Sequence, residues 1–160
     1  MADAGTSNIS TEIFLDEIRS KISGICDYTP ADSGDKWIFA EIAVSNSADT
    51  DLVAPLDFFG TVDTIVVAND DVEWIAIKNI SATATDGIGI RIDAGTAAWN
   101  AAGTMFIGAG EMLVMKCRVT PIGSVHAISV TMTGASGKPS GTHSGTVACH
   151  VAAILADGGS

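Results

Sequence analysis

Basic residues are scarce in this chain of 160 residues. It has 8 lysines and arginines against 19 aspartates and glutamates, which gives a net charge of −11. A nucleic-acid-binding surface needs clustered basic side chains to neutralise phosphates, so we expect no nucleic acid partner. An anionic membrane surface would repel the chain. Charged residues of both signs make up only 17% of it, against about a quarter in an average soluble protein.

Long apolar runs are absent as well. The longest, residues 147–156, has about half of the roughly 20 residues that a membrane-spanning helix needs, and it contains His150. The start of the chain has neither the positive region nor the apolar region of a secretory signal. We therefore expect no membrane association.

The three cysteines, Cys26, Cys117 and Cys149, are an odd number without C-x-x-C spacing. This argues against a disulfide framework or a zinc knuckle and indicates small buried thiols. Catalytic motifs are lacking too. The segment at 134–141 contains Gly-Lys, but Pro139 stands where a phosphate-binding loop needs serine or threonine. We expect no enzyme, no cofactor and no bound metal, with the three histidines half-buried and hydrogen-bonded.

The negative charge is unevenly distributed. Residues 1–73 contain 15 acidic and three basic side chains, whereas residues 74–160 contain four acidic and five basic ones. We interpret the acids between residues 49 and 73 as a solvated face, with a calcium or partner site as the alternative. Hydrophobic residues form 47% of the chain. The charge-poor second half should therefore bury much of its surface, in its own core or against neighbours.

Residues 11–23 are predicted to form one amphipathic helix. Ser10 or Thr11 is a suitable N-cap, and Gly24 is a suitable stop. The apolar stripe at helical spacing consists of Phe14, Ile18, Ile22 and Ile25.

Everything after the helix indicates strands. The predicted strands are residues 37–44, 62–67, 72–80, 88–93, 111–119, 124–133 and 145–155. Crossover helices are missing, so a parallel sheet is excluded. The predicted fold is mainly β, an antiparallel β-sandwich or jelly roll with one short N-terminal amphipathic helix. We place an N-terminal arm and the helix in residues 1–35, and a single β-sandwich domain in residues 36–160.

Three central segments carry a resemblance. They read EWIAIKNIS (73–81), DGIGIRIDAG (86–95) and FIGAGEMLVMKC (106–117). A strand ending in Lys-Asn precedes an I-x-I-x-D strand, and a Gly-Glu turn then leads into a long apolar strand. This pattern resembles small structural proteins of tailed-phage virions and is most similar to head decoration (cement) proteins. It covers about residues 37–157 and contains no catalytic motif.

The resemblance implies a non-enzymatic protein of the outer capsid surface, made in the host cytoplasm. Such a protein binds the major capsid protein across capsomer joints as a homo-oligomer, commonly a trimer. The alternatives are a tail or fibre-head component that binds a host receptor, and a carbohydrate-binding β-sandwich module. From position alone we assign partner contact to Phe14, Ile18 and Ile22 on the predicted helix, and to Trp99 in the loop AGTAAWNAAG.

Overall fold

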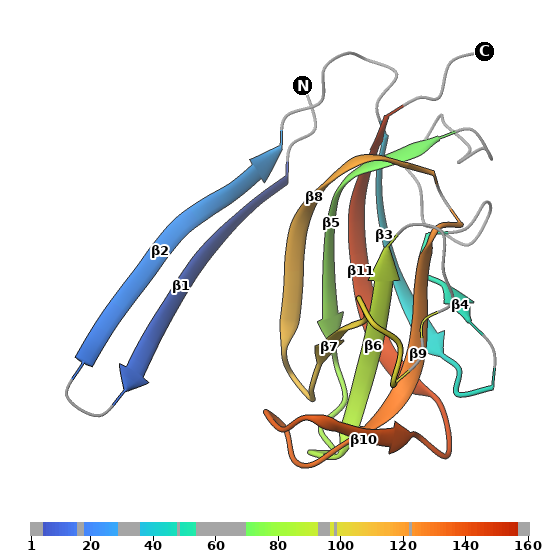
Figure 1. The fold of residues 1–160 in the computed structure, drawn as a ribbon. Coiled ribbons are helices and arrows are strands. Elements are labelled where there is room, and N and C mark those ends of the chain that lie inside the picture. The colour runs from blue at the N-terminus through green and yellow to red at the C-terminus, as the bar shows by residue number, and fades with distance from the viewer. Residues whose placement is uncertain are drawn as a thin grey trace.

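The computed structural model describes residues 5–15, 18–28, 36–47, 49–53, 70–92, 97, 99–121 and 123–156. Throughout this part of the chain the regular secondary structure is β-strand, and every pair of strands is antiparallel (Figure 1). None of the described residues belongs to a helix long and apolar enough to cross a membrane. The mainly β, antiparallel part of the predicted fold is therefore confirmed.

One sheet has four strands in the order β3-β11-β5-β8. Their bounds are Lys36–Val44 for β3, Val147–Ala156 for β11, Asp71–Asn79 for β5 and Met112–Pro121 for β8. The central strand β11 pairs with both neighbours, so that Val151 lies opposite Ala40 on β3 and opposite Ile77 on β5. Strand β8 is one edge of this sheet, and β3 is the other.

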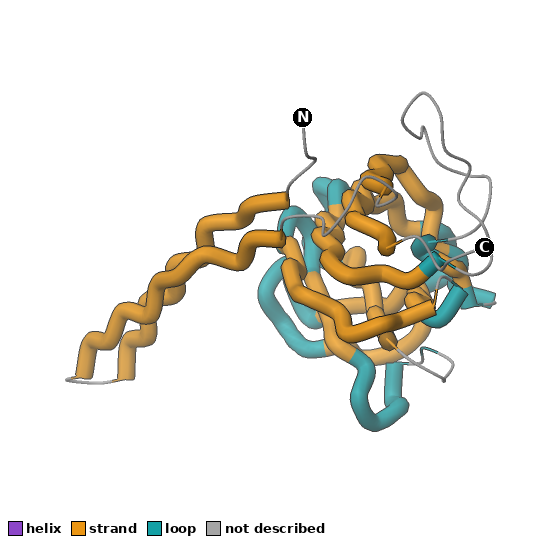
Figure 2. Tube along the Cα trace, turned by 90° about the horizontal axis from the view of Figure 1, so that it is seen from above, coloured by secondary structure: helices purple, strands orange, loops and turns teal. Residues whose placement is uncertain are grey.

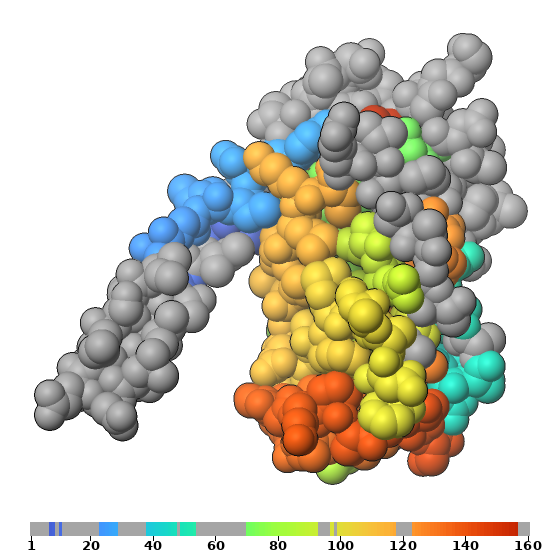
Figure 3. Space-filling model, viewed as in Figure 1, coloured from blue at the N-terminus to red at the C-terminus, as the bar shows by residue number. Residues whose placement is uncertain are grey.

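The second sheet has five strands. Four follow the order β10-β9-β6-β7, and β4 also pairs with β9. Their bounds are Pro139–Thr142 for β10, Val125–Met132 for β9, Asp86–Ile92 for β6, Met105–Ile107 for β7 and Thr50–Asp51 for β4. In the space-filling view, β7 (yellow) and β10 (orange-red) lie on the face toward the viewer (Figure 3).

Both sheets contribute to one hydrophobic core. The four-stranded sheet supplies buried residues that include Ile38, Val44, Ile75, Ile77, Cys149 and Val151. The five-stranded sheet supplies Ile88, Ile90, Val125 and Ala127. Seen from above, strands surround this interior (Figure 2). Burial of these side chains is the main stabilising term, at roughly 1.5–3 kcal/mol for each large aliphatic side chain.

The predicted N-terminal helix is wrong. The segment forms an antiparallel hairpin of β1 (Gly5–Leu15) and β2 (Ile18–Tyr28), in register from Gly5 opposite Tyr28 to Leu15 opposite Ile18. Spacing of four residues also fits a strand, because alternate residues of a strand share a face. Isoleucine is moreover a better strand former than helix former.

The hairpin extends from the side of the molecule next to β8 (Figures 1 and 2). One ion pair links its described side chains to the body, with Lys116 Nζ 3.9 Å from Asp27 Oδ1. Both side chains are more than half exposed, so this pair contributes little to stability. The hairpin therefore projects from the body as a two-stranded ribbon (Figure 1).

Six of the seven predicted strands are confirmed within a few residues, as β3, β5, β6, β8, β9 and β11. The seventh, at 62–67, lies outside the described residues. The sequence analysis missed β4, β7 and β10, which are short. It took the β10 segment for a loop because nearly all of its neighbours are turn formers.

Candidate functional site

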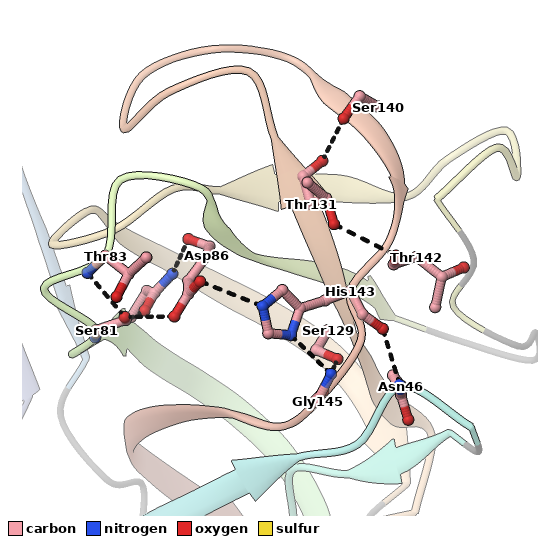
Figure 4. A network of polar contacts seen from close by, with 11 residues as sticks. Asn46, Ser81, Thr83, Asp86, Ser129, Thr131, Ser140, Thr142, His143 and Gly145 are labelled. Carbon is pink, nitrogen blue, oxygen red and sulfur yellow. Dashed lines mark hydrogen bonds and ion pairs between the residues drawn. The ribbon is translucent and has the colours of Figure 1, made fainter.

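A polar cluster joins several loops at one end of the fold, and Asp86 at the start of β6 is its centre (Figure 4). One carboxylate oxygen, Oδ2, accepts a hydrogen bond of 2.7 Å from the hydroxyl of Ser81. The other, Oδ1, lies 3.3 Å from Nε2 of His143. The side chains of Asp86 and His143 are only 15% and 20% exposed, so the pair is largely shielded from water.

His143 is held through both ring nitrogens and through its backbone. Its Nδ1 accepts a 3.0 Å hydrogen bond from the backbone N–H of Gly145, which leaves the proton of the neutral ring on Nε2, facing Asp86. Its backbone carbonyl accepts a 2.8 Å bond from the side-chain amide of Asn46, and its N–H donates to the carbonyl of Ser129. The cluster thus connects the loops after β3, β5 and β10.

Asn79, the last residue of β5, completes the cluster and is fully buried. Its side-chain amide donates to the carbonyl of Asp86, and its Oδ1 accepts from the N–H of Ser81, both at 3.0 Å. Its backbone exchanges hydrogen bonds with the turn before β8, since its N–H donates to Glu111 and its carbonyl accepts from Gly110. The Lys-Asn and Gly-Glu elements of the sequence pattern are therefore in contact.

The order of groups in this cluster decides its chemistry. Ser81 donates to the carboxylate and not to the imidazole, so these three residues do not make the Ser–His contact of a Ser-His-Asp triad. The free lone pair of His143 is already used by Gly145. The contacts of Asp86 and His143 fix the loops in place, and the hydroxyl of Ser81 is paired with the carboxylate of Asp86.

The other two histidines also face carboxylates. Nδ1 of His126 lies 2.9 Å from Asp51, without the angle of a hydrogen bond, across the β4–β9 pair. Nε2 of His150 lies 3.6 Å from Glu41 across the β3–β11 pair. All three histidines are partly buried next to an acid, but the expected ring hydrogen bond is found for His143 and not for His126 or His150. Within the described residues no group of three or more histidine, cysteine and acidic side chains could hold a metal ion.

The thiols follow the expectation for Cys117 and Cys149, which are buried, while Cys26 on the hairpin is half-buried. Burial raises the pKa of Cys149 to about 12, and the nearby carboxylate of Glu41 adds to the shift. Burial likewise raises the pKa of Cys117 to about 11, with a smaller contribution from Glu73. Both core thiols are therefore protonated at neutral pH.

The predicted partner-contact residues lie in two separate regions. Phe14, Ile18 and Ile22 fall on the hairpin, where Phe14 pairs with Arg19 and Ile22 with Thr11. Residues directly opposite each other share a face of the ribbon, and successive residues along a strand lie on alternate faces. Position 14 therefore shares a face with position 19, and positions 18 and 22 lie on the other face, so the three do not form one stripe. Trp99 lies between β6 and β7 with 40% of its surface exposed.

The predicted acidic face is only partly found. Asp51 is exposed and faces His126, and Asp71 and Glu73 on β5 are half-exposed. Asp70 is fully buried, which corrects its assignment to a solvated face. Asp57 and Asp63 lie outside the described residues.

The outer face of the four-stranded sheet is a feature that sequence reasoning did not identify. Here Phe39 and Met112 are 45% and 54% exposed. Small apolar residues surround them, namely Ala43, Ala76, Val114, Ala148 and Ala152. The outer face of an antiparallel sheet is usually polar, whereas this one combines these apolar residues with a row of Glu41, His150 and Lys78, so it is suited to cover by another surface. The alternating alanines of β11 were the available signal.

No family model matches the chain, and neither the curated proteins nor the solved structures contain a significant match.

Proposed function

We propose that this chain is a non-enzymatic structural protein of a tailed-phage virion, a decoration protein that binds the major capsid protein across capsomer joints and stabilises the head. The observation that carries the proposal is the apolar outer face of the four-stranded sheet, together with the hairpin beside β8. A protein that acts by binding neighbouring subunits needs an exposed apolar patch as its contact surface, whereas an isolated monomer does not. In this proposal the two sheets form a β-sandwich, and the copies bound to the capsid form a homo-oligomer, a trimer.

The mechanism would be mass action. A protein that binds the assembled lattice and not the free capsid subunit lowers the free energy of the lattice. An oligomer contacts several capsid subunits at once, so its avidity exceeds the affinity of one contact. The polar cluster around Asp86 and His143 suits this role because it holds loops rigidly at one end of the fold.

Binding to capsids tests the proposal. Particles assembled from the major capsid protein that accompanies this chain are incubated with it, sedimented and heated. We expect saturable co-sedimentation and a higher disruption temperature of the particles. Trp99→Ala, at a side chain that is 40% exposed, should weaken binding, and a melting curve of the free variant checks that it still folds.

Two other results would replace the proposal. Binding to phage tails and not to heads would favour a tail or fibre-head component. Binding to a glycan array that Trp99→Ala abolishes would favour a carbohydrate-binding module, since Trp99 is the exposed tryptophan of the described part.

A further inference from the structure

We propose that the outer face of the four-stranded sheet pairs with the same face of a second copy. The two copies are related by a two-fold axis that runs parallel to β11, midway between the two facing four-stranded sheets. This inference concerns the free protein in solution and does not depend on the proposed function. It rests on two rows of residues that cross the sheet in register.

The first row is charged. Glu41 on β3, His150 on β11 and Lys78 on β5 are direct neighbours across the strands. Glu41 and Lys78 are exposed, and His150 lies between them, with Nε2 3.6 Å from Glu41. Across these three strands the row therefore runs from an acid on β3 to a base on β5, and Met112 continues it on the edge strand β8.

A two-fold axis along β11 reverses this row in the second copy. Glu41 of each copy then faces Lys78 of the other, and the axis passes between the two His150 rings. A two-fold axis perpendicular to β11 in the same plane would instead place Glu41 against Glu41 and Lys78 against Lys78. Opposite charges across an interface fix the register, and like charges exclude the alternative.

The second row supplies complementary shape. This row lies two residues along the strands from the charged row. It consists of Phe39 on β3, Ala152 on β11 and Ala76 on β5, which lie opposite one another. The same axis places the exposed ring of Phe39 over the small Ala76 of the partner and brings the two Ala152 residues together. Large residues over small ones are how packed sheets interdigitate. One axis thus satisfies both rows.

The size of the face sets the expected strength. With the axis along β11, strands β3, β11 and β5 of the two copies face each other, and three strands with about five residues along each give an area of roughly 240 Å². Stable interfaces bury about 800 Å² on each partner, so the pair should be weak, with a dissociation constant in the micromolar range or above. The other end of the face does not take part, because Trp74 and Ile154 there are already buried within the chain, at 6% and 3% exposure.

Sedimentation velocity over a concentration series up to several hundred micromolar tests the inference. We expect a monomer–dimer equilibrium. Glu41→Lys or Lys78→Glu alone should weaken it by about tenfold or more, because like charges then face each other. The double variant Glu41→Lys/Lys78→Glu should restore it to within about threefold of the original. Ala76→Phe, which fills the place of the Phe39 ring, should abolish it.

Lys138→Glu is the matched control, because it makes the same charge change at an exposed position outside the face and should leave association unchanged. Melting curves at low concentration confirm that each variant folds. A monomer at every concentration would overturn the inference. A trimer would overturn it too. So would an oligomer of any size whose formation is impaired as much in the double variant as in the single variants.

Discussion

Nε2 of His143 lies 3.3 Å from Oδ1 of Asp86, a contact that joins the loop before β11 to the first residue of β6. Asp86 also accepts from Ser81, so a single carboxylate holds two loops. Buried acceptors of this kind are costly to leave unpaired, which makes Asp86 the most informative position in the cluster.

Replacing Asp86 by asparagine should lower the free energy of unfolding by about 1–3 kcal/mol, because Ser81 and His143 lose a charged acceptor in a shielded site. Chemical denaturation at neutral pH measures this. The control is Asp51→Asn, whose aspartate side chain is 45% exposed beside His126 and should contribute under about 1 kcal/mol. An equal loss of unfolding free energy in the two variants would contradict the prediction that Asp86 stabilises the fold more than an exposed aspartate beside a histidine does.

The turn before β8 provides a second prediction. A Cβ atom on Gly108 would meet the backbone carbonyl oxygen of Ala135, which a side-chain rotation cannot relieve. Gly108→Ala should therefore destabilise the fold by roughly 1–3 kcal/mol. Gly141→Ala is the control, since open space surrounds that position in β10. An unchanged melting temperature for Gly108→Ala would contradict this geometry.

The three thiols should react at different rates. Cys26 is half-buried on the hairpin, whereas Cys117 and Cys149 are buried and their pKa values are raised. A thiol reagent at neutral pH should modify one cysteine quickly and the other two only when the chain unfolds, because the thiolate is the reactive form. Mass spectrometry of the modified peptides identifies the fast one. Rapid modification of Cys149 would mean that the core opens easily.

The raised pKa of Cys149 also predicts that the protein loses stability at alkaline pH. Below pH 9.0, the ordinary value, Cys149 keeps its proton in both the folded and the unfolded state. Between pH 9 and about 12 the unfolded chain releases this proton and the folded chain retains it. The free energy of unfolding should then fall as pH rises, by at most about 1.4 kcal/mol per pH unit from this group. In Cys149→Ala the free energy of unfolding should fall less steeply with pH. An identical slope in this variant would show that Cys149 is not the group responsible.

The N-terminal hairpin can be checked directly by NMR. The register places Glu12 opposite Lys21 and Ser10 opposite Ser23. We expect cross-strand contacts between the backbones of these pairs and extended chemical shifts throughout the segment. Helical contacts between residues three apart would restore the original prediction for residues 11–23.

Local sequence was sufficient for the long strands and insufficient for the hairpin. Alternation identified β6, β9 and β11, and apolar, β-branched and aromatic runs identified β3, β5 and β8, because each strand supplies residues to the core. In the hairpin, Ile18 and Ile22 satisfy both the helical and the strand period. The choice between them is made by pairing with β1, which a local pattern does not contain.

The polar cluster was beyond sequence reasoning for a related cause. The carboxylate partner of each histidine is on another strand or loop, far away in the chain. Only the register of the sheets brings Glu41 next to His150, and only the meeting of three loops brings Asp86 to His143. The Lys-Asn and Gly-Glu elements were visible in the sequence, but their contact through Asn79 was not.

Cryo-electron microscopy of capsids with and without this protein tests the central claim, that the chain is a head decoration protein, most directly. The account predicts ordered additional density on the outer surface of the head, at joints between capsomers around local three-fold positions. Heads without added density, with the protein found on the tail or nowhere on the particle, would contradict it.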